Sequence, residues 1–467
     1  MAITLIQDVA HKEMPVGTDW IFTISSTNVT GNFKFKYIAD LSIDLVGGSF
    51  AVRLKFSPNS TGNGIINLSD ILEQYVSSDN LGSTLSGYEA QFKGVDAVAG
   101  SEMPIHLIDK LSLNTKNVQR LNIAWGEEYS VNATDAPTEY PGQLLSMNYM
   151  FWNGVAYNNE QELVSGEYGV NLKKWGGKNF IISGLSRANL LTDAPISKQY
   201  IGDNEYATLS FLNGFLGAGH SKPDKYTIEF FDVDGVSISS VDTDINAANG
   251  GYDSGADTFL QVSYFLQQYI GVGTANMLGA GITIPTNWNS YTIKLKVGAN
   301  TSTETYTYFK RDADCRGFEK IRLTWLNKYG VWDYYTFNKK NLRSTDIKRT
   351  EFNRVKGDWN SSTFNKYGYE RGRGVLSTMA TETMSLNSDW FTNDEEAAWI
   401  EQLFISPEVY ILGDYYSNDT APANYGEYMT PVIVTNNSYD RYTRANDKVS
   451  QYEIDIEYSI NKRVQRA

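Results

Sequence analysis

The sequence predicts a mainly β protein, and three observations support this prediction. Aromatic residues are abundant, with 31 Tyr, 21 Phe and 10 Trp in 467 residues, and such side chains suit pleated, half-buried strands. Glycine outnumbers proline by 39 to 11, which suits strands joined by tight turns. Several segments alternate apolar and polar residues, a period that places one set of side chains in a core and the other in water. The clearest are 33–37, 52–56, 291–297 and 452–460. We therefore expect antiparallel sandwiches rather than buried parallel sheets.

The domain organisation is expected to follow the turn signals and changes of pattern along the chain. We predict an N-terminal arm at 1–17, a first β-sandwich module at 18–130, a hairpin-bearing connector at 131–199, a second β-sandwich module at 200–345 and a small α+β C-terminal domain at 346–467. In the connector, the pair Asn153-Gly154 favours a tight hairpin because both residues tolerate positive φ.

The two sandwich modules share a faint repeat. Residues 19–25 (DWIFTIS) resemble 205–211 (EYATLSF), 71–76 (ILEQYV) resemble 265–270 (FLQQYI), and 120–125 (RLNIAW) resemble 322–325 (RLTW). We interpret the second pair as a short helical turn in each module. The spacing between partners grows along the chain, as loop insertions in a duplicated module would produce. Two unrelated sandwiches of similar composition remain the alternative.

The C-terminal domain contains the clearest predicted helix. Thr392 as N-cap with Glu395 three residues later forms a capping box, and Ala397 and Ile400 begin an apolar stripe. Pro407 should end the helix. Strands are expected around it at 375–387, 408–413, 430–436 and 449–460.

Charge and composition exclude several classes of protein. The chain carries 54 acidic and 40 basic residues, a net charge of −14. Binding of nucleic acid requires clustered Lys and Arg, so we expect no nucleic-acid partner. No segment approaches the roughly 18 apolar residues that a membrane helix needs, so we expect no membrane insertion. A single cysteine, Cys315, allows no disulfide within the chain. The first residues lack the basic region of a secretory signal, and we expect folding in a cytoplasm.

The search for catalytic chemistry predicts no enzyme, no catalytic residue and no cofactor. His11, His106 and His220 lie far apart in sequence, and none is paired with Cys or Glu at metal-ligand spacing. No Gly-x-Ser-x-Gly nucleophile elbow occurs. Cys315 is better interpreted as a packed or surface cysteine than as a nucleophile.

Two chemical alternatives stay open. A pair of carboxylates about 5 to 10 Å apart on a β scaffold would suit a glycosidase, although no local signature marks such a pair. The acidic loop 242–253 imitates the start of a calcium loop, but Ala247 stands where the sharp turn needs Gly. A solvated loop is the simpler interpretation, and calcium binding remains an open question.

One local charge feature predicts a docking surface. Seven basic residues stand close together against only two acids, Asp346 and Glu351, which leaves a local charge of +5. This basic stripe consists of Lys339, Lys340, Arg343, Lys348, Arg349, Arg354 and Lys356. It is expected to dock an acidic surface of the same or another subunit. Ion pairs within the chain are the alternative. Lys462, Arg463 and Arg466 form a similar short basic end.

Six segments of the C-terminal part share a pattern with known proteins: 316–337 (RGFEKIRLTWLNKYGVWDYYTF), 387–390 (NSDW), 395–403 (EEAAWIEQL), 406–410 (SPEVY), 431–435 (PVIVT) and 452–458 (YEIDIEY). Together they resemble a family of virion structural proteins from tailed bacteriophages, particularly phages of flavobacteria and their relatives. The likeness covers roughly the last 150 residues, and 39–41 (ADL) with 64–72 (GIINLSDIL) are similar in a looser way. These motifs carry no catalytic residue.

The resemblance implies a structural role in the tail or baseplate of a virion, after folding in the host cytoplasm. Its implied partners are other virion proteins and copies of this chain. The alternative is a receptor-binding adhesin of the same particle, whose sandwich loops would bind a host surface glycan through stacked aromatic rings and nearby carboxylates.

Overall fold

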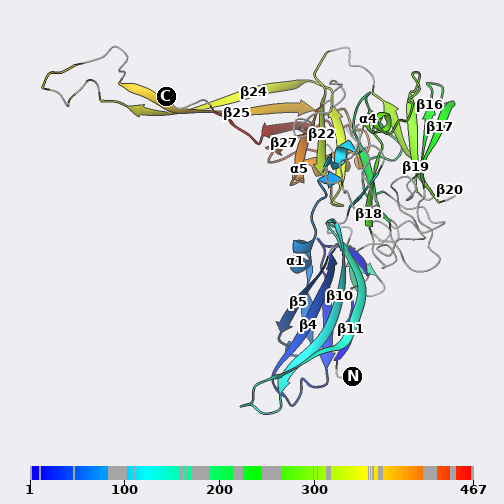
Figure 1. The fold of residues 1–467 in the computed structure, drawn as a ribbon, viewed down its shortest axis with the longest axis vertical. Coiled ribbons are helices and arrows are strands. Elements are labelled where there is room, and N and C mark those ends of the chain that lie inside the picture. Colours follow the sequence, from blue (N-terminus) through cyan, green and yellow to red (C-terminus); the bar gives the residue numbers. More distant parts are fainter. Residues whose placement is uncertain are drawn as a thin grey trace. The chain divides into compact units, whose positions relative to one another are not determined.

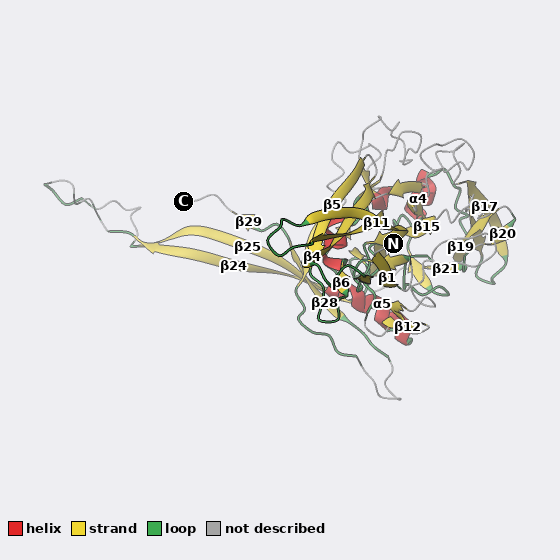
Figure 2. Cartoon of the chain, turned by 90° about the horizontal axis from the view of Figure 1, so that it is seen from below, coloured by secondary structure: helices red, strands yellow, loops and turns green. Residues whose placement is uncertain are grey.

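The computed structural model confirms a mainly β protein with few helices, as Figure 2 shows. It describes residues 3–9, 12–45, 48–82, 103–108, 111–114, 116–157, 161–164, 167–170, 190–213, 225–244, 266–297, 299–301, 303–311, 317–355, 357, 359, 362–365, 372–413, 429–441 and 449–463. The chain forms two compact units. The first holds residues 1–312, 326–333 and 414–425, and the second holds 313–325, 334–413 and 426–467.

The first unit begins with a five-stranded sheet in the order β2-β11-β10-β4-β5 (Figure 1). Its strands are β2 (Glu13–Pro15), β4 (Phe33–Leu45), β5 (Gly48–Phe56), β10 (Val118–Ser130) and β11 (Thr138–Trp152). β2 is parallel to β11, and all other neighbours are antiparallel. The predicted alternation continues along β4, where Tyr37, Leu41 and Ile43 are buried. These side chains face the module's core.

A second sheet covers that core. It has the order β1-β3-β6 and consists of β1 (Ile3–Gln7), β3 (Ile21–Ser26) and β6 (Gly64–Asn67). Phe22 of β3 meets two aromatic rings of the larger sheet, Trp125 at 5.5 Å and Tyr149 at 5.4 Å between centroids. These rings join the inner faces of the two sheets, and the module is therefore a β-sandwich. After β6 comes the predicted helical turn, α1 (Ser69–Leu72) with η1 (Glu73–Tyr75).

The second module repeats this topology. Its larger sheet has the order β14-β21-β19-β16-β17. β14 is parallel to its neighbour β21, as β2 is parallel to β11. The strands are β14 (Gln199–Ile201), β16 (Lys225–Phe231), β17 (Ser237–Asp244), β19 (Ser290–Val297) and β21 (Tyr306–Lys310), with β20 (Asn300–Thr301) beside β19. In the smaller sheet, β15 (Thr208–Asn213) pairs antiparallel with β18 (Leu266–Gly271), as β3 pairs with β6. α4 (Thr274–Gly279) follows β18, as α1 follows β6.

The structure corrects two of the three sequence landmarks of this repeat. The first, 19–25 with 205–211, matches β3 to β15. The second is wrong because 265–270 falls on strand β18, and the counterpart of α1 is α4. The third is wrong because 322–325 lies in the sheet of the second unit, whereas the counterpart of β10 is β19.

One strand links the two modules. β9 (Leu111–Asn114) lies between α1 and β10 in sequence, yet it pairs antiparallel with β18 of the second module. The buried side chains of Asn117 and Gln267 are hydrogen-bonded beside this junction, and Gln267 donates to Ser210 Oγ at 2.8 Å. The two sandwiches are therefore joined by a shared sheet as well as by the chain.

Strands extend past the expected domain boundaries. β1 and β2 lie within residues 1–17, β11 lies within 131–199, and β24 (Asn341–Asn353) runs across the boundary at 345. Short pairs occur at β7 (Leu81–Gly82) with β8 (Met103–Pro104), before η2 (Ile105–Leu107), and at β12 (Gln161–Val164) with β13 (Glu167–Val170).

The hairpin predicted at Asn153-Gly154 is wrong. Neither residue has a positive φ, and β11 ends just before them. The amide of Val155 then donates to Lys328 O at 2.8 Å. A Cβ on Gly154 would lie 3.2 Å from that same oxygen and 2.9 Å from Trp152 Nε1. Glycine is needed here for a close approach between backbones rather than for a turn.

The second unit is built on one sheet in the order β23-β22-β26-β27-β28-β25-β24, with β29 beside β25. The strands are β22 (Ile321–Leu326), β23 (Trp332–Phe337), β24, β25 (Arg373–Asn387), β26 (Val409–Leu412), β27 (Met429–Val434), β28 (Glu453–Tyr458) and β29 (Lys462–Arg463). α5 (Asp394–Ile405) buries Trp399 against the rings of Trp325 and Tyr335, at 5.4 and 6.0 Å. This unit mixes helix and sheet, as expected for 346–467, but its sheet also includes β22 and β23, which the sequence analysis placed in the second sandwich module at 200–345.

The cap of α5 differs from the prediction by one residue. Asn393 is the N-cap, and its side chain accepts from the Glu395 amide at 3.1 Å, whereas Thr392 precedes the cap. The helix ends at Ile405, two residues before Pro407, as predicted. No helix in the described part of the chain is both long and apolar enough to cross a membrane.

The corrected cap makes a direct prediction. Asn393→Ala should destabilise α5 by about 1 kcal/mol, because it leaves an orphan amide of the first turn without its acceptor. Hydrogen exchange of peptides covering 394–405 should show faster exchange in this variant. Thr392→Ala is the matched control and should leave exchange unchanged. Equal acceleration in both variants would contradict the assignment of the cap.

Candidate functional site

The predicted basic stripe lies along the edge strand of the second unit. Lys339 and Lys340 precede β24, while Arg343, Lys348 and Arg349 lie within it. Arg354 follows the strand, and Lys356 falls outside the described residues. The structure therefore places the six described members on one strand and its ends.

The inner part of the stripe is paired within the chain. Lys339 Nζ lies 3.1 Å from Asp389 Oδ1, and Arg343 Nη2 lies 2.6 Å from Glu319 Oε1. Further out, Lys348 and Arg349 are exposed, and neither makes an ion pair with any described residue. The alternative of intramolecular pairing thus holds for Lys339 and Arg343 at the inner end of the stripe.

This outer end belongs to a long hairpin arm, which we define as β24, β25 and the described residues between them (Figure 1). The two strands pair antiparallel from Asn341↔Leu386 to Asn353↔Arg373. β28 pairs with β25 only over Thr383–Asn387, and β29 only at Met379 and Ala380. Beyond these contacts the described arm consists of two strands.

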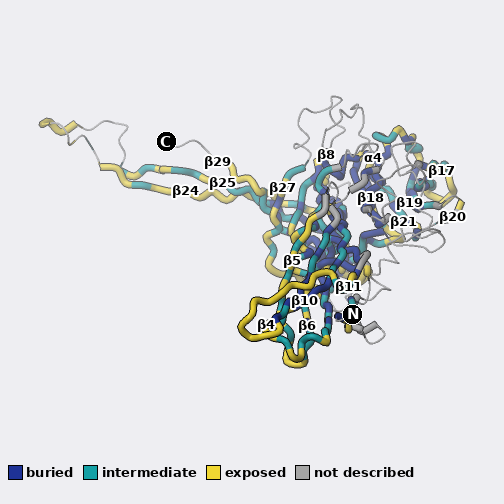
Figure 3. Tube along the Cα trace, turned by 60° about the horizontal axis from the view of Figure 1, so that its bottom comes forward, coloured by how far each residue is buried: buried dark blue, intermediate teal, exposed yellow. Residues whose placement is uncertain are grey.

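Both faces of the arm are open to solvent (Figure 3). Every residue of β24 from Leu342 to Glu351 is exposed. Successive side chains of a strand point to opposite faces, so Ile347 and Arg349 share one face, while Lys348 and its cross-strand partner Met379 share the other. Each face therefore carries an exposed apolar side chain beside a cation.

Apolar exposure continues along the arm. The exposed fractions are 62% for Leu342, 50% for Ile347 and 48% for Met379. Past the end of β24, Val355, Trp359 and Phe364 are also exposed, and the two aromatic rings lie 5.2 Å apart. We call this group, whose two rings are Trp359 and Phe364, the aromatic tip. Single exposed apolar residues are normal, whereas larger exposed apolar patches are typical of interaction surfaces.

The sequence contains a signal for this arm that charge counting missed. In β24 the apolar residues Leu342, Ile347 and Phe352 are spaced by five, which matches neither the period of a half-buried strand nor that of an amphipathic helix. A segment with only three apolar residues in thirteen and no alternation indicates that, if it is a strand, it has no buried face.

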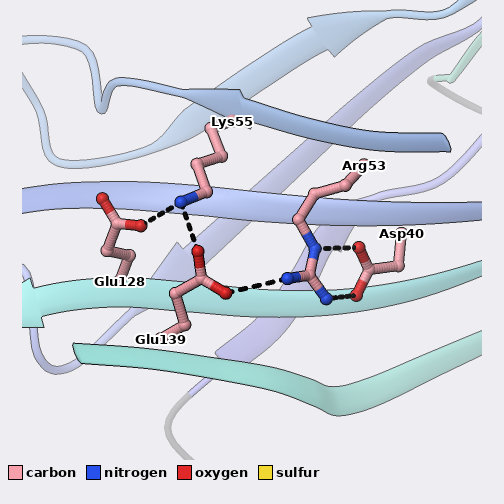
Figure 4. A network of polar contacts seen from close by, with 5 residues as sticks. All are labelled: Asp40, Arg53, Lys55, Glu128 and Glu139. Carbon is pink, nitrogen blue, oxygen red and sulfur yellow. Dashed lines mark hydrogen bonds and ion pairs between the residues drawn. The ribbon is translucent and has the colours of Figure 1, made fainter.

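Carboxylates gather on the larger sheet of the first module, but as ion pairs (Figure 4). Arg53 binds Asp40 through Nε and Nη2 at 2.6 and 2.9 Å, and its Nη1 binds Glu139 at 2.8 Å. Lys55 binds both Glu128 and Glu139. The Lys55 hydrogen bond lowers the pKa of Glu139. A glycosidase needs one carboxyl that stays protonated, and the position of Lys55 favours ionisation instead.

Metal chemistry has no site in the described part of the chain, where no group of three or more His, Cys, Asp or Glu could hold an ion. His106 is buried and packs edge-on against Trp332 at 5.0 Å. His11, His220 and Cys315 lie outside the described residues.

The acidic loop 242–253 is described only at its start, through 244. Asp242 is already held there by three groups. Thr227 Oγ1 donates to its Oδ1 at 2.6 Å, and the ammonium groups of Lys225 and Lys296 lie at 2.9 and 3.3 Å. The Thr227 hydrogen bond, followed by the lysines, lowers the pKa of Asp242 from 3.8 to about 2.

This pKa shift predicts an acid-dependent loss of stability. A carboxyl with a lowered folded pKa stabilises above its unfolded pKa, and the contribution disappears as the pH falls from about 4 to about 2. Asp242→Asn should lower the free energy of unfolding at pH 7, measured by urea titration, by under about 1 kcal/mol because Asp242 and its lysines are partly exposed. The loss of stability below pH 4 should also be smaller in this variant. Asp234→Asn, in the exposed β16–β17 turn, is the control. Parallel acid unfolding of wild type and Asp242→Asn would contradict the prediction.

Comparisons with known proteins give no family. No family model matches the chain, and no curated protein matches it. Among solved structures, a trypsin-activated alpha-2-macroglobulin from Escherichia coli is similar at 7% identity and a TM-score of 0.17, over 85% of this chain and 20% of that one. A Salmonella alpha-2-macroglobulin reacted with methylamine gives 10% identity and a TM-score of 0.14, over 82% and 27%. The chain spans about a fifth to a quarter of the length of these proteins. Scores this low carry no argument about fold or function.

Proposed function

We propose that this chain is a non-enzymatic structural component of a tailed-bacteriophage virion, located in its tail or baseplate, and that it acts by assembling with other subunits. The observation that carries the proposal is the hairpin arm, whose two strands expose both faces with apolar and basic side chains.

The physical argument concerns the stability of the arm. A two-stranded hairpin alone is marginally stable in water, because it cannot bury a hydrophobic face. An arm with exposed Leu342, Ile347 and Met379 gains stability once a partner covers these side chains. A neighbouring subunit in a large assembly would cover these side chains, and the apolar area buried in that contact would hold the arm in place.

Other features support the same proposal. The segments that resemble virion structural proteins form the sheet and helix from which the arm extends: 316–337 contains β22 and β23, and 395–403 lies in α5. The tandem sandwich modules provide repeated, disulfide-independent β structure. The net charge of −14 keeps free subunits soluble before assembly.

A direct test is to look for the chain in the particle. Mass spectrometry of purified virions of the encoding phage should detect it at stoichiometric level. Gold-labelled antibodies against the first module should decorate the tail or baseplate in electron micrographs. A chain that is absent from intact particles and stays a monomer in solution would refute the proposal.

The adhesin alternative has one observation in its favour. Tyr140, which is 39% exposed, stacks on Tyr129 at 5.0 Å in the first module, and its cross-strand partner Glu127 lies on the same face of the sheet. Stacked rings beside carboxylates suit a sugar face. If the alternative is right, a glycan array probed with the full chain should give signals that Tyr140→Ala abolishes and Phe33→Ala, a substitution of another exposed ring, preserves. An array without signal would leave the structural proposal as the better one.

A further inference from the structure

Resting on the proposed function, the geometry points to the partner of the hairpin arm: we infer that the arm of one subunit docks onto an acidic surface of a second copy of this chain. The arm supplies the cations and the aromatic tip, and the rest of the neighbouring copy supplies the negative field.

The charge distribution argues for this partner. Residues 339–387, which contain the arm, carry ten basic and five acidic side chains, a net charge of +5. Since the whole chain carries −14, the remainder carries −19. A copy of this chain is therefore a strongly acidic partner for a basic arm, and opposite potentials favour docking. Lys348 and Arg349, which make no ion pair with described residues, are the cations placed to meet it.

The net charges disfavour a pairing of two arms. The segment that contains the arm carries +5 in each copy, whereas the remainder of each copy carries −19, so opposite potentials direct an arm to the remainder of its neighbour. The arm is therefore inferred to meet a different surface of its neighbour. Contacts between unlike surfaces produce closed rings or open filaments rather than isolated dimers.

The aromatic tip provides the apolar anchor of this contact. Trp359 is 71% exposed and Phe364 is 55% exposed. Gly357 has a φ of +88°, and a Cβ on it would lie 2.3 Å from the Phe364 ring, so the backbone at Gly357 passes close to that ring. Exposed Trp and Phe held in a fixed geometry bind with little loss of conformational entropy, and Trp is among the residues that dominate binding energy at interfaces.

The experiment is sedimentation velocity on the full chain across micromolar concentrations and two salt concentrations. Wild type should self-associate reversibly into rings or filaments, and added salt should weaken this association because it screens the charge contact. The pair Lys348→Glu with Arg349→Glu should raise the apparent Kd at least about tenfold. The pair Trp359→Ala with Phe364→Ala should do the same while retaining the salt dependence.

The matched control reverses the same amount of charge elsewhere. Lys36→Glu with Lys116→Glu changes two exposed lysines of the first module and should leave the apparent Kd within about twofold of wild type. All variants alter exposed side chains, and circular dichroism and thermal unfolding should show that each still folds.

Three results would overturn the inference: arm variants that associate like wild type, an equal loss in the control, or a wild-type chain that stays monomeric. A monomeric chain that is nevertheless found in virions, bound through its arm to a different protein, would refute the second copy as partner and leave the proposed function standing. A chain that neither associates nor occurs in virions would refute both.

Discussion

The larger described sheets of this protein each have a face that must be removed from water, and the aromatic side chains that cover it constrain the rest of the fold. Phe22 and Trp125 close the first sandwich from opposite sheets, and Trp399 of α5 closes the second unit over Trp325. Some buried tyrosines also satisfy their hydroxyl groups there: Tyr291 Oη donates to Val272 O and Tyr37 Oη donates to Gly62 O, each at 2.7 Å. Large buried rings hold the two layers together without disulfides.

The hairpin arm does not follow this constraint, because its side chains change from buried to exposed along one and the same strand. In β25, Met384 and Leu386 are fully buried in the sheet of the second unit, while Met379, five residues from Met384, is about half exposed. The inner end of the arm is thus fixed by the unit's own core, and the outer end depends on its two-stranded ladder and on whatever covers it. Local stability should decrease outward along the arm. An element anchored at one end and unsatisfied at the other is suited to reach a neighbouring subunit.

The parts of the fold that sequence predicted are those whose pattern is local. Tyr291, Ile293 and Leu295 alternate in sequence and are all buried in β19, and the stripe and end of α5 follow from nearby residues. The helical turn expected at 265–270 was wrong because Gln267 and Gln268 are buried in a strand, and Gln267 has its polar groups satisfied by distant Asn117 and Ser210. Such long-range pairing leaves no local signal. For the site, charge counting found the stripe, but exposure on both faces depends on which strands do not pair.

The docking inferred for the arm would combine two interactions that act at different stages of association. Charge acts over about 8 to 10 Å in physiological salt, so Lys348 and Arg349 would orient the arm toward an acidic surface before contact. Rim charges of this kind mainly change association rates, whereas buried aromatic anchors mainly set dissociation rates. Trp359 and Phe364 would therefore determine how long a docked arm stays. The cations lie on β24 and the aromatic anchors lie beyond its end. An incorrect encounter that satisfies only the charges would therefore dissociate rapidly, and only a correctly aligned arm would bury the anchors as well. If the proposed docking is right, this order of events would let an acidic subunit remain soluble while free and still assemble with a defined geometry.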